Sequence, residues 1–138
     1  MEKRDLYDEN RHLTRETIYK SEDIPDGRYI IVVLVFIQNS KVEFLIQKRS
    51  EIKNGKYATT GGHCKTGESS IQGILAEIKK IGLDVKAEDL QLYYSGKAGF
   101  AFWDDYYIKM DVPNIEKLEL QKEEVESVCW LTEEEKNN

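Results

Sequence analysis

The run of residues 28–37, RYIIVVLVFI, constrains the fold more than any other part of this chain. After its first residue it is a nearly continuous series of β-branched and aliphatic side chains. A strand with this composition is buried on both faces, so other elements must cover the sheet on each side. A turn at 38–41 and the segment 42–48, VEFLIQK, predict an antiparallel partner for this strand.

Shorter segments of β-branched and aromatic residues predict the other strands of the sheet. Two of them flank a turn at Asn10-Arg11 and form a β extension within residues 1–27. Thr132 and Glu135 form a capping-box pattern that predicts a short final helix. We expect one domain over residues 1–138, because a chain of this length buries a single core. The predicted strands lie at 6–9, 14–19, 28–37, 42–48, 56–60, 91–94, 102–110 and 128–131.

A glycine-rich loop that begins at Gly61 precedes an amphipathic helix at about 70–81. Apolar residues recur there at the spacing of one helix face, and Ser69 or Ser70 offers an N-cap. With strands before and after it, this helix predicts an α/β fold in which a mixed sheet lies between helices. The apolar face consists of Ile71, Ile74, Leu75, Ile78 and Ile81.

Composition excludes several classes of function. The net charge is −6, and the sequence has no clustered basic face of the kind that nucleic-acid binding requires. No run of eighteen apolar residues predicts a membrane span, and the start MEKRDLYDEN is too polar for a signal peptide. Two cysteines, Cys64 and Cys129, do not make a disulfide framework or a zinc site. We expect a cytoplasmic protein that binds neither nucleic acid nor membrane.

Residues 61–83, GGHCKTGESSIQGILAEIKKIGL, resemble the Nudix box, a loop–helix–loop that holds a divalent metal against a diphosphate. The family pattern is Gly, five residues, Glu, seven residues, then Arg-Glu-apolar-any-Glu-Glu-any-Gly-apolar. Gly62, Glu68 and Glu77 stand at these intervals, and the apolar Ile78 follows. The resemblance covers residues 5–135 and implies the Nudix fold, an α/β/α sandwich with a mixed β-sheet between helices.

Three positions depart from the family pattern. Ala76 stands in place of Arg, Lys80 replaces the first Glu of the pair, and the second Glu is missing, so Gly82 comes one residue early. Mg²⁺ is bound by oxygen ligands, and helix positions i, i+3 and i+4 share a face. A lysine there supplies charge but no ligand. We therefore expect Mg²⁺ or Mn²⁺ to bind weakly at Glu77.

The resemblance also implies which residues make up the site. The stretch QKRS ends the second long strand, and an acidic loop precedes the last strand. Each of these has an ordinary alternative as a solvated strand end or a solvated loop. The expected residues are Glu77, Glu68 and Glu124 for catalysis, Glu77 and Glu124 for metal binding, and Lys48, Arg49, Gly61, Gly62 and Lys80 for substrate binding.

Three functions are compatible with these residues. The resemblance implies a hydrolase that cleaves a nucleoside diphosphate linked to another moiety by metal-assisted water attack, with turnover impaired by the missing carboxylates. A second function is a diphosphate-binding module without turnover. The third is isopentenyl-diphosphate isomerase, whose relatives the segments DLYDEN and EDIPDGRY resemble. That enzyme has a cysteine where this chain has Gly61, and Cys64 follows His63 instead, so we favour the hydrolase. Its partner is a small-molecule diphosphate, and a homodimer is left open.

Overall fold

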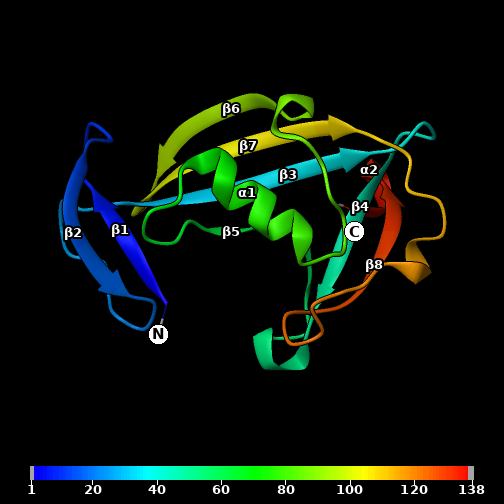
Figure 1. The fold of residues 1–138 in the computed structure, drawn as a ribbon, viewed down its shortest axis with the longest axis horizontal. Coiled ribbons are helices and arrows are strands. Elements are labelled where there is room, and N and C mark those ends of the chain that lie inside the picture. The colour runs from blue at the N-terminus through cyan, green and yellow to red at the C-terminus, as the bar shows by residue number, and fades with distance from the viewer. Residues whose placement is uncertain (1, 137–138) are drawn as a thin grey trace.

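The computed structural model describes residues 2–136 and contains a six-stranded mixed sheet, a separate two-stranded hairpin and two α-helices (Figure 1). The strands are β1 Lys3–Tyr7, β2 Leu13–Tyr19, β3 Ile30–Gln38, β4 Glu43–Arg49, β5 Tyr57–His63, β6 Gln91–Ala98, β7 Ala101–Lys109 and β8 Val125–Thr132. The helices are α1 Ser70–Lys79 and α2 Glu133–Lys136, with 3₁₀ turns η1 Glu51–Lys53, η2 Ala87–Asp89 and η3 Ile115–Lys117. Neither α-helix is long and apolar enough to cross a membrane.

The central strand β3 has different neighbours along its length. The sheet order is β6-β7-β3-β5-β4-β8, and β3 runs parallel to β7 but antiparallel to β5. Near the turn that joins them, β3 also pairs with β4 through Gln38 and Phe44. β5 therefore enters the sheet between β3 and β4 where these two strands separate, and it carries Gly61 and Gly62 into the sheet.

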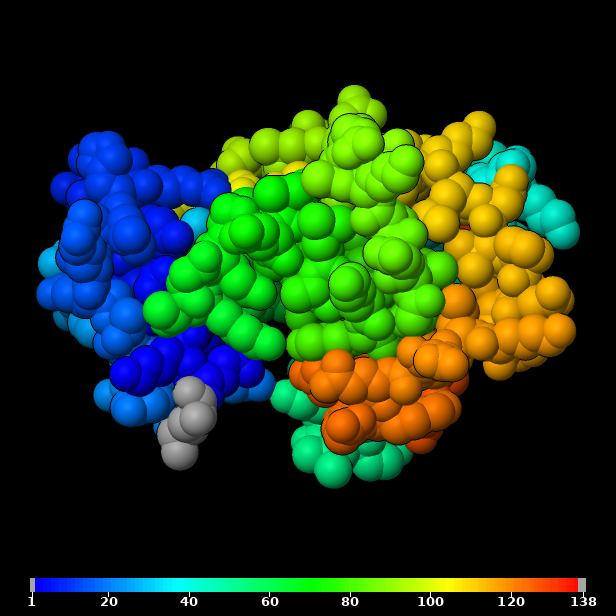
Figure 2. Space-filling model, viewed as in Figure 1, coloured from blue at the N-terminus to red at the C-terminus, as the bar shows by residue number. Residues whose placement is uncertain are grey.

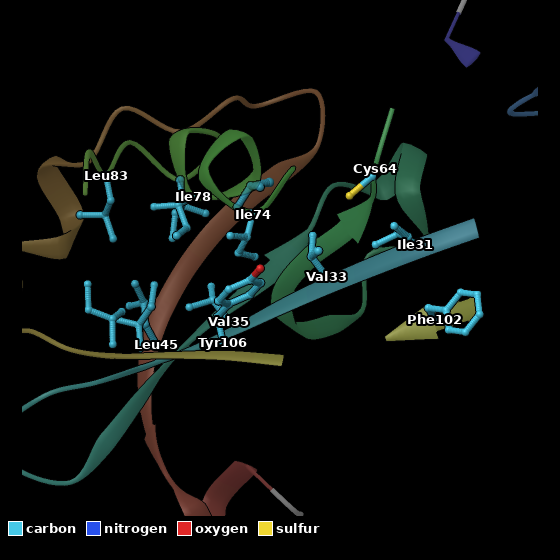
Figure 3. Close-up of a cluster of buried hydrophobic side chains, with 14 residues drawn as sticks. Ile31, Val33, Val35, Leu45, Cys64, Ile74, Ile78, Leu83, Phe102 and Tyr106 are labelled. Atoms are coloured by element: carbon cyan, nitrogen blue, oxygen red, sulfur yellow. The ribbon is translucent and has the colours of Figure 1, made fainter. Parts of the chain in front are cut away.

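Helix α1 covers one face of the sheet with its apolar side. Ile74 and Ile78 are fully buried and pack with Val33 and Val35 of β3 (Figure 3). The helix begins at a capping box in which the Ser69 side chain accepts a hydrogen bond from the Gln72 N–H and the Gln72 side chain accepts one from the Ser69 N–H. The predicted helix is thus confirmed, with Ser69 as its N-cap.

The N-terminal hairpin and α2 cover parts of the opposite face. Leu6 and Ile18 of the hairpin form a second buried cluster with Ile30 and Val32 of β3. At the other end of the sheet, the four-residue α2 contacts β4 and β8. The capping box at Thr132 is present, with both of its hydrogen bonds to Glu135. The predicted mixed sheet between helices is confirmed, although the hairpin also covers part of the face on which α2 lies.

Two predicted strands continue beyond their predicted ends: β6 runs on to Ala98, and β5 runs on to His63 just before α1. The glycine-rich segment is not a loop at its start, because β5 continues through Gly61 and Gly62 to His63. These residues pair with β3, and a Cβ on Gly61 would collide with the carbonyl oxygen of Val33. Strand pairing at such a close approach requires glycine, and glycine runs in a sequence are easily interpreted as loops.

Candidate functional site

A cavity of about 340 Å³ lies between the hairpin, β5, the side of α1 and the loop before β8. Figure 2 shows the hairpin in blue, the α1 region in green and the loop before β8 in orange around a hollow in the surface. Six cationic side chains and three carboxylates line it, although the whole chain has a net charge of −6. The cations are Arg4, Lys20, Arg49, Lys53, Lys65 and Lys80, and the carboxylates are Glu2, Glu77 and Glu124.

The glycines of β5 let the cavity reach α1. Gly62 faces Glu77 so closely that a Cβ on Gly62 would collide with the carboxylate. The next residue of β5, His63, pairs with Val32 of β3, and Val32 also pairs with Trp103 of β7. His63, Val32 and Trp103 therefore form a row on the sheet along the cavity wall. A side chain in place of Gly62 would collide with Glu77, so glycine at this position keeps the α1 carboxylate next to the strand.

The ammonium group of Lys80 lies between the two carboxylates expected to bind metal. Its Nζ is 2.7 Å from Glu77 Oε2 and 3.0 Å from Glu124 Oε2. Glu124 Oε1 also lies 3.6 Å from the Nζ of Lys53. The side chains of Glu77 and Lys80 are mostly buried, so these are partly desolvated ion pairs and not surface contacts.

The ionisation of this cluster follows from burial and from the central lysine. Burial raises the pKa of Glu77, and the hydrogen bond from Lys80 offsets only part of the increase. Burial alone would lower the pKa of Lys80, but its hydrogen bonds to Glu77 and Glu124 outweigh that effect, and its pKa lies above the ordinary value. Lys80 is therefore a permanent cation between the two carboxylates at neutral pH.

These side chains do not fit a Mg²⁺ site. Mg²⁺ requires oxygen ligands in near-octahedral geometry, and both carboxylates direct an oxygen to an ammonium group instead. In the described part of the chain, no group of three or more His, Cys, Asp or Glu residues is arranged to hold a metal ion. The side chain between Glu77 and Glu124 is Lys80, and its ammonium group donates hydrogen bonds but cannot act as a metal ligand.

The structure brings together most of the expected site residues but not all of them. Arg49, Gly61, Gly62, Glu77, Lys80 and Glu124 line the cavity. Glu68 does not, and its Oε1 accepts a hydrogen bond from the backbone N–H of Lys65, where it closes the turn before α1. Lys48 does not either, and its Nζ lies 2.9 Å from Glu126 Oε2 on the neighbouring strand β8. The roles of Glu68 and Lys48 in function stay predictions.

Sequence reasoning missed four of the six cationic side chains that line the cavity, namely Lys65 and three from other segments. Arg4 and Lys20 come from the N-terminal hairpin, and Lys53 comes from η1. One signal for Arg4 was available, since in KRDLY it is two residues from the apolar Leu6 and so shares its face of the strand. Lys20 and Lys53 follow no pattern, because only tertiary structure brings them to the cavity.

His63 is expected to titrate near pH 4 and therefore to be neutral at pH 6. Desolvation, followed by the charges of Arg4 and Lys20, lowers its pKa to about 4. Because the unfolded chain takes up this proton nearer the ordinary value of 6.5, the His63 contribution to stability falls as the pH drops from 6.5 towards 4. NMR titration of the His63 imidazole measures this value. A pKa of 6 or more for His63 would contradict the arrangement.

Two sequence relatives match nearly the whole chain. An uncharacterized Nudix hydrolase of Listeria innocua is 36% identical over 141 residues, which cover 97% of this chain and 82% of the relative. An uncharacterized Nudix hydrolase of Listeria monocytogenes is 34% identical over 142 residues, which cover 98% of this chain and 82% of the relative. No family model matches the chain.

Solved structures share the fold. The DR0079 protein of Deinococcus radiodurans has a TM-score of 0.77 at 21% identity, and the match covers 97% of this chain and 85% of that one. A NUDIX-family hydrolase of Clostridium perfringens has a TM-score of 0.58 at 17% identity, over 80% of this chain and 85% of that one. The structural likeness supports the fold, and the sequence relatives establish descent. This chain belongs to the Nudix hydrolase family.

Proposed function

We propose that this protein binds the diphosphate group of a small molecule in the cavity and hydrolyses it slowly. The observation that carries the proposal is the charge of the cavity, where six cations and three carboxylates line a concave surface of an otherwise acidic chain. The cations outnumber the carboxylates, and a cleft with an excess of one sign of charge concentrates ligands of the opposite sign. A diphosphate is a compact anion of suitable size for this cavity, and nucleoside diphosphates linked to a further group are the candidate substrates.

Binding without a divalent metal is part of this proposal. Lys80 and Lys65 line the cavity near Glu77, and a lysine ammonium donates hydrogen bonds to phosphate oxygens. Lys80 supplies at this place the positive charge that a divalent cation would otherwise supply. Impaired hydrolysis follows from the same arrangement, because an ammonium group cannot bind and activate a water molecule as a metal does.

Calorimetric titration with inorganic pyrophosphate in the presence of a chelator tests the binding. The unmodified protein is expected to bind pyrophosphate without added metal, with an affinity that falls as salt is added because the cavity charges are screened. Lys80→Met should weaken binding about tenfold or more, the equivalent of one lost charge-assisted contact.

Lys79→Met is the matched control for this experiment. Lys79 is the neighbouring residue on α1, is exposed and does not line the cavity. Its replacement removes the same charge from the same helix, so the affinity should change little. An equal loss in both variants would mean that net charge alone attracts pyrophosphate. Binding that appears only with Mg²⁺ would contradict the proposal.

A further inference from the structure

The position of Arg4 is fixed by its neighbours in β1. The carbonyl oxygen of Lys3 accepts a hydrogen bond from the Thr66 N–H at 2.9 Å, and Asp5 Oδ2 accepts one from the Gly67 N–H at 2.9 Å. Both bonds attach β1 to the turn that precedes α1. Because side chains alternate along a strand, Arg4 lies on the opposite side of β1 from Lys3 and Asp5, and there it lines the cavity.

Arg4 is a buried residue, only 7% exposed, whose Nε lacks a hydrogen-bond partner within residues 2–136. No carboxylate of the described chain lies within ion-pair distance of it. A buried charged group that lacks a partner costs folding free energy, so such groups are rare unless they bind something.

Two lysines lie beside each other in the same part of the cavity. Contact with the ammonium group of Lys53, followed by desolvation, lowers the pKa of Lys20. Within residues 2–136 Lys20 has no ion pair, and Lys53 has one long contact, 3.6 Å, with Glu124. The carboxylate of Glu2 is also nearby. It raises the pKa of Lys20, but by less than Lys53 and desolvation lower it. Like charges repel, so this arrangement is stabilised when an anion lies between them.

We infer that Arg4, Lys20 and Lys53 form a second oxyanion subsite in this cavity, next to the cluster of Glu77, Lys80 and Glu124, and that this subsite binds a phosphate group. Arg4 offers a planar set of donors suited to phosphate, and the two lysines add charge. This inference rests on the proposed function and specifies its ligand. The ligand class becomes an organic diphosphate that carries an additional phosphate, with both groups bound in this one cavity.

Titration with inorganic phosphate, followed by two-dimensional NMR of the amide groups, tests the subsite. We expect phosphate to shift the amide signals of Arg4, Lys20 and His63 in a saturable manner. Arg4→Gln should raise the dissociation constant read from these signals about tenfold. Arg15→Gln is the matched control, because Arg15 is an exposed residue of the same hairpin that does not line the cavity.

Two further variants keep the result interpretable. Arg4 is buried, so Arg4→Gln is expected to lower stability as well as remove the charge. Lys20→Gln changes an exposed position, and it should weaken the phosphate-induced shifts of the same amide signals. Lys80→Met should leave the phosphate shifts of Arg4 and Lys20 in place. Phosphate shifts confined to Gly62 and Lys80 would overturn the second subsite while leaving the proposed function intact. Equal phosphate affinity in Lys20→Gln and the unmodified protein would also overturn it.

Discussion

Replacing Arg11 by methionine is expected to lower the free energy of unfolding by about 3 kcal/mol, the cost of leaving a buried charge without its partner. Arg11 donates two hydrogen bonds to Asp104, at 2.9 and 2.6 Å, and Asp104 is only 3% exposed. The pair joins the tip of the N-terminal hairpin to β7. Chemical denaturation at pH 7 measures the change.

The pH dependence and a double variant identify the cause of this loss. Burial alone would raise the pKa of Asp104, but hydrogen bonds from Arg11, Ser70 and Ser95 outweigh it, and the pKa is below the ordinary 3.8. The native ion pair therefore stabilises the fold above that pH and is lost below it. In Arg11→Met the carboxylate takes up a proton more readily, so the deficit should shrink as the pH falls towards 4. Adding Asp104→Asn should recover much of the stability.

Arg28→Met is the control for the Arg11 experiment. Arg28 pairs with Glu16 at 2.5 Å on the surface of the same hairpin, where solvent screens the charges. Its replacement should shift the unfolding midpoint far less than that of Arg11. If the two variants unfold alike, the Arg11–Asp104 pair does not hold the hairpin to the sheet.

The predictable part of the fold is the part with strong periodicity. The run that became β3, the apolar face of α1 and the capping box at Thr132 repeat local patterns that one sequence displays. Strand ends were less predictable, because tertiary pairing decides them. β8, predicted at 128–131, begins at Val125, whose buried side chain lies beside Arg49 on β4.

The residues of the candidate site that belong to a sequence motif could be predicted, and the contacts between distant segments could not. Helical spacing placed position 81 on the same stripe as Glu77, but α1 ends at Lys79, and Ile81 is fully buried in the core. The Ile81 N–H bonds to the carbonyl of Ile78, a tighter turn than that of an α-helix, and Gly82 follows with φ +80°. Only position 80 therefore remains on the cavity side after Glu77. The contact between Lys80 and Glu124 joins residues 44 positions apart, and no local pattern encodes it.

Hydrolysis of ADP-ribose by the unmodified protein is expected to be slower than about 1 per second, the low end of ordinary enzyme turnover, even with saturating Mg²⁺. The reason is the ammonium group between Glu77 and Glu124, at 2.7 and 3.0 Å from their oxygens. A divalent ion cannot bind both carboxylates there without displacing Lys80 from two partly buried ion pairs. The products are AMP and ribose 5-phosphate, and the phosphate that an added alkaline phosphatase releases from them, corrected with a no-protein blank, gives the rate.

Lys80→Glu is expected to convert this place into a metal site. The change removes the competing cation and adds a third carboxylate next to Glu77 and Glu124, the kind of oxygen ligand that Mg²⁺ prefers. Because Ile81 lies in the core, this one substitution alters the cavity side of the helix without disturbing the packing. Calorimetry should show Mg²⁺ binding that the unmodified protein lacks, and ADP-ribose turnover should rise at least about tenfold, or 1.4 kcal/mol of barrier.

Lys80→Gln separates the two effects of that substitution. It removes the ammonium group but adds no carboxylate, so it should gain little Mg²⁺ affinity, and Glu77→Gln combined with Lys80→Glu should lose what the single variant gained. If Lys80→Gln gains as much turnover as Lys80→Glu, the ammonium group impairs turnover by blocking the site, and the absence of a carboxylate at position 80 is not the cause. If the unmodified protein turns over ADP-ribose at about 1 per second or faster, the prediction of impaired turnover is wrong. Catalysis would then depend on side chains outside the cluster of Glu77, Lys80 and Glu124.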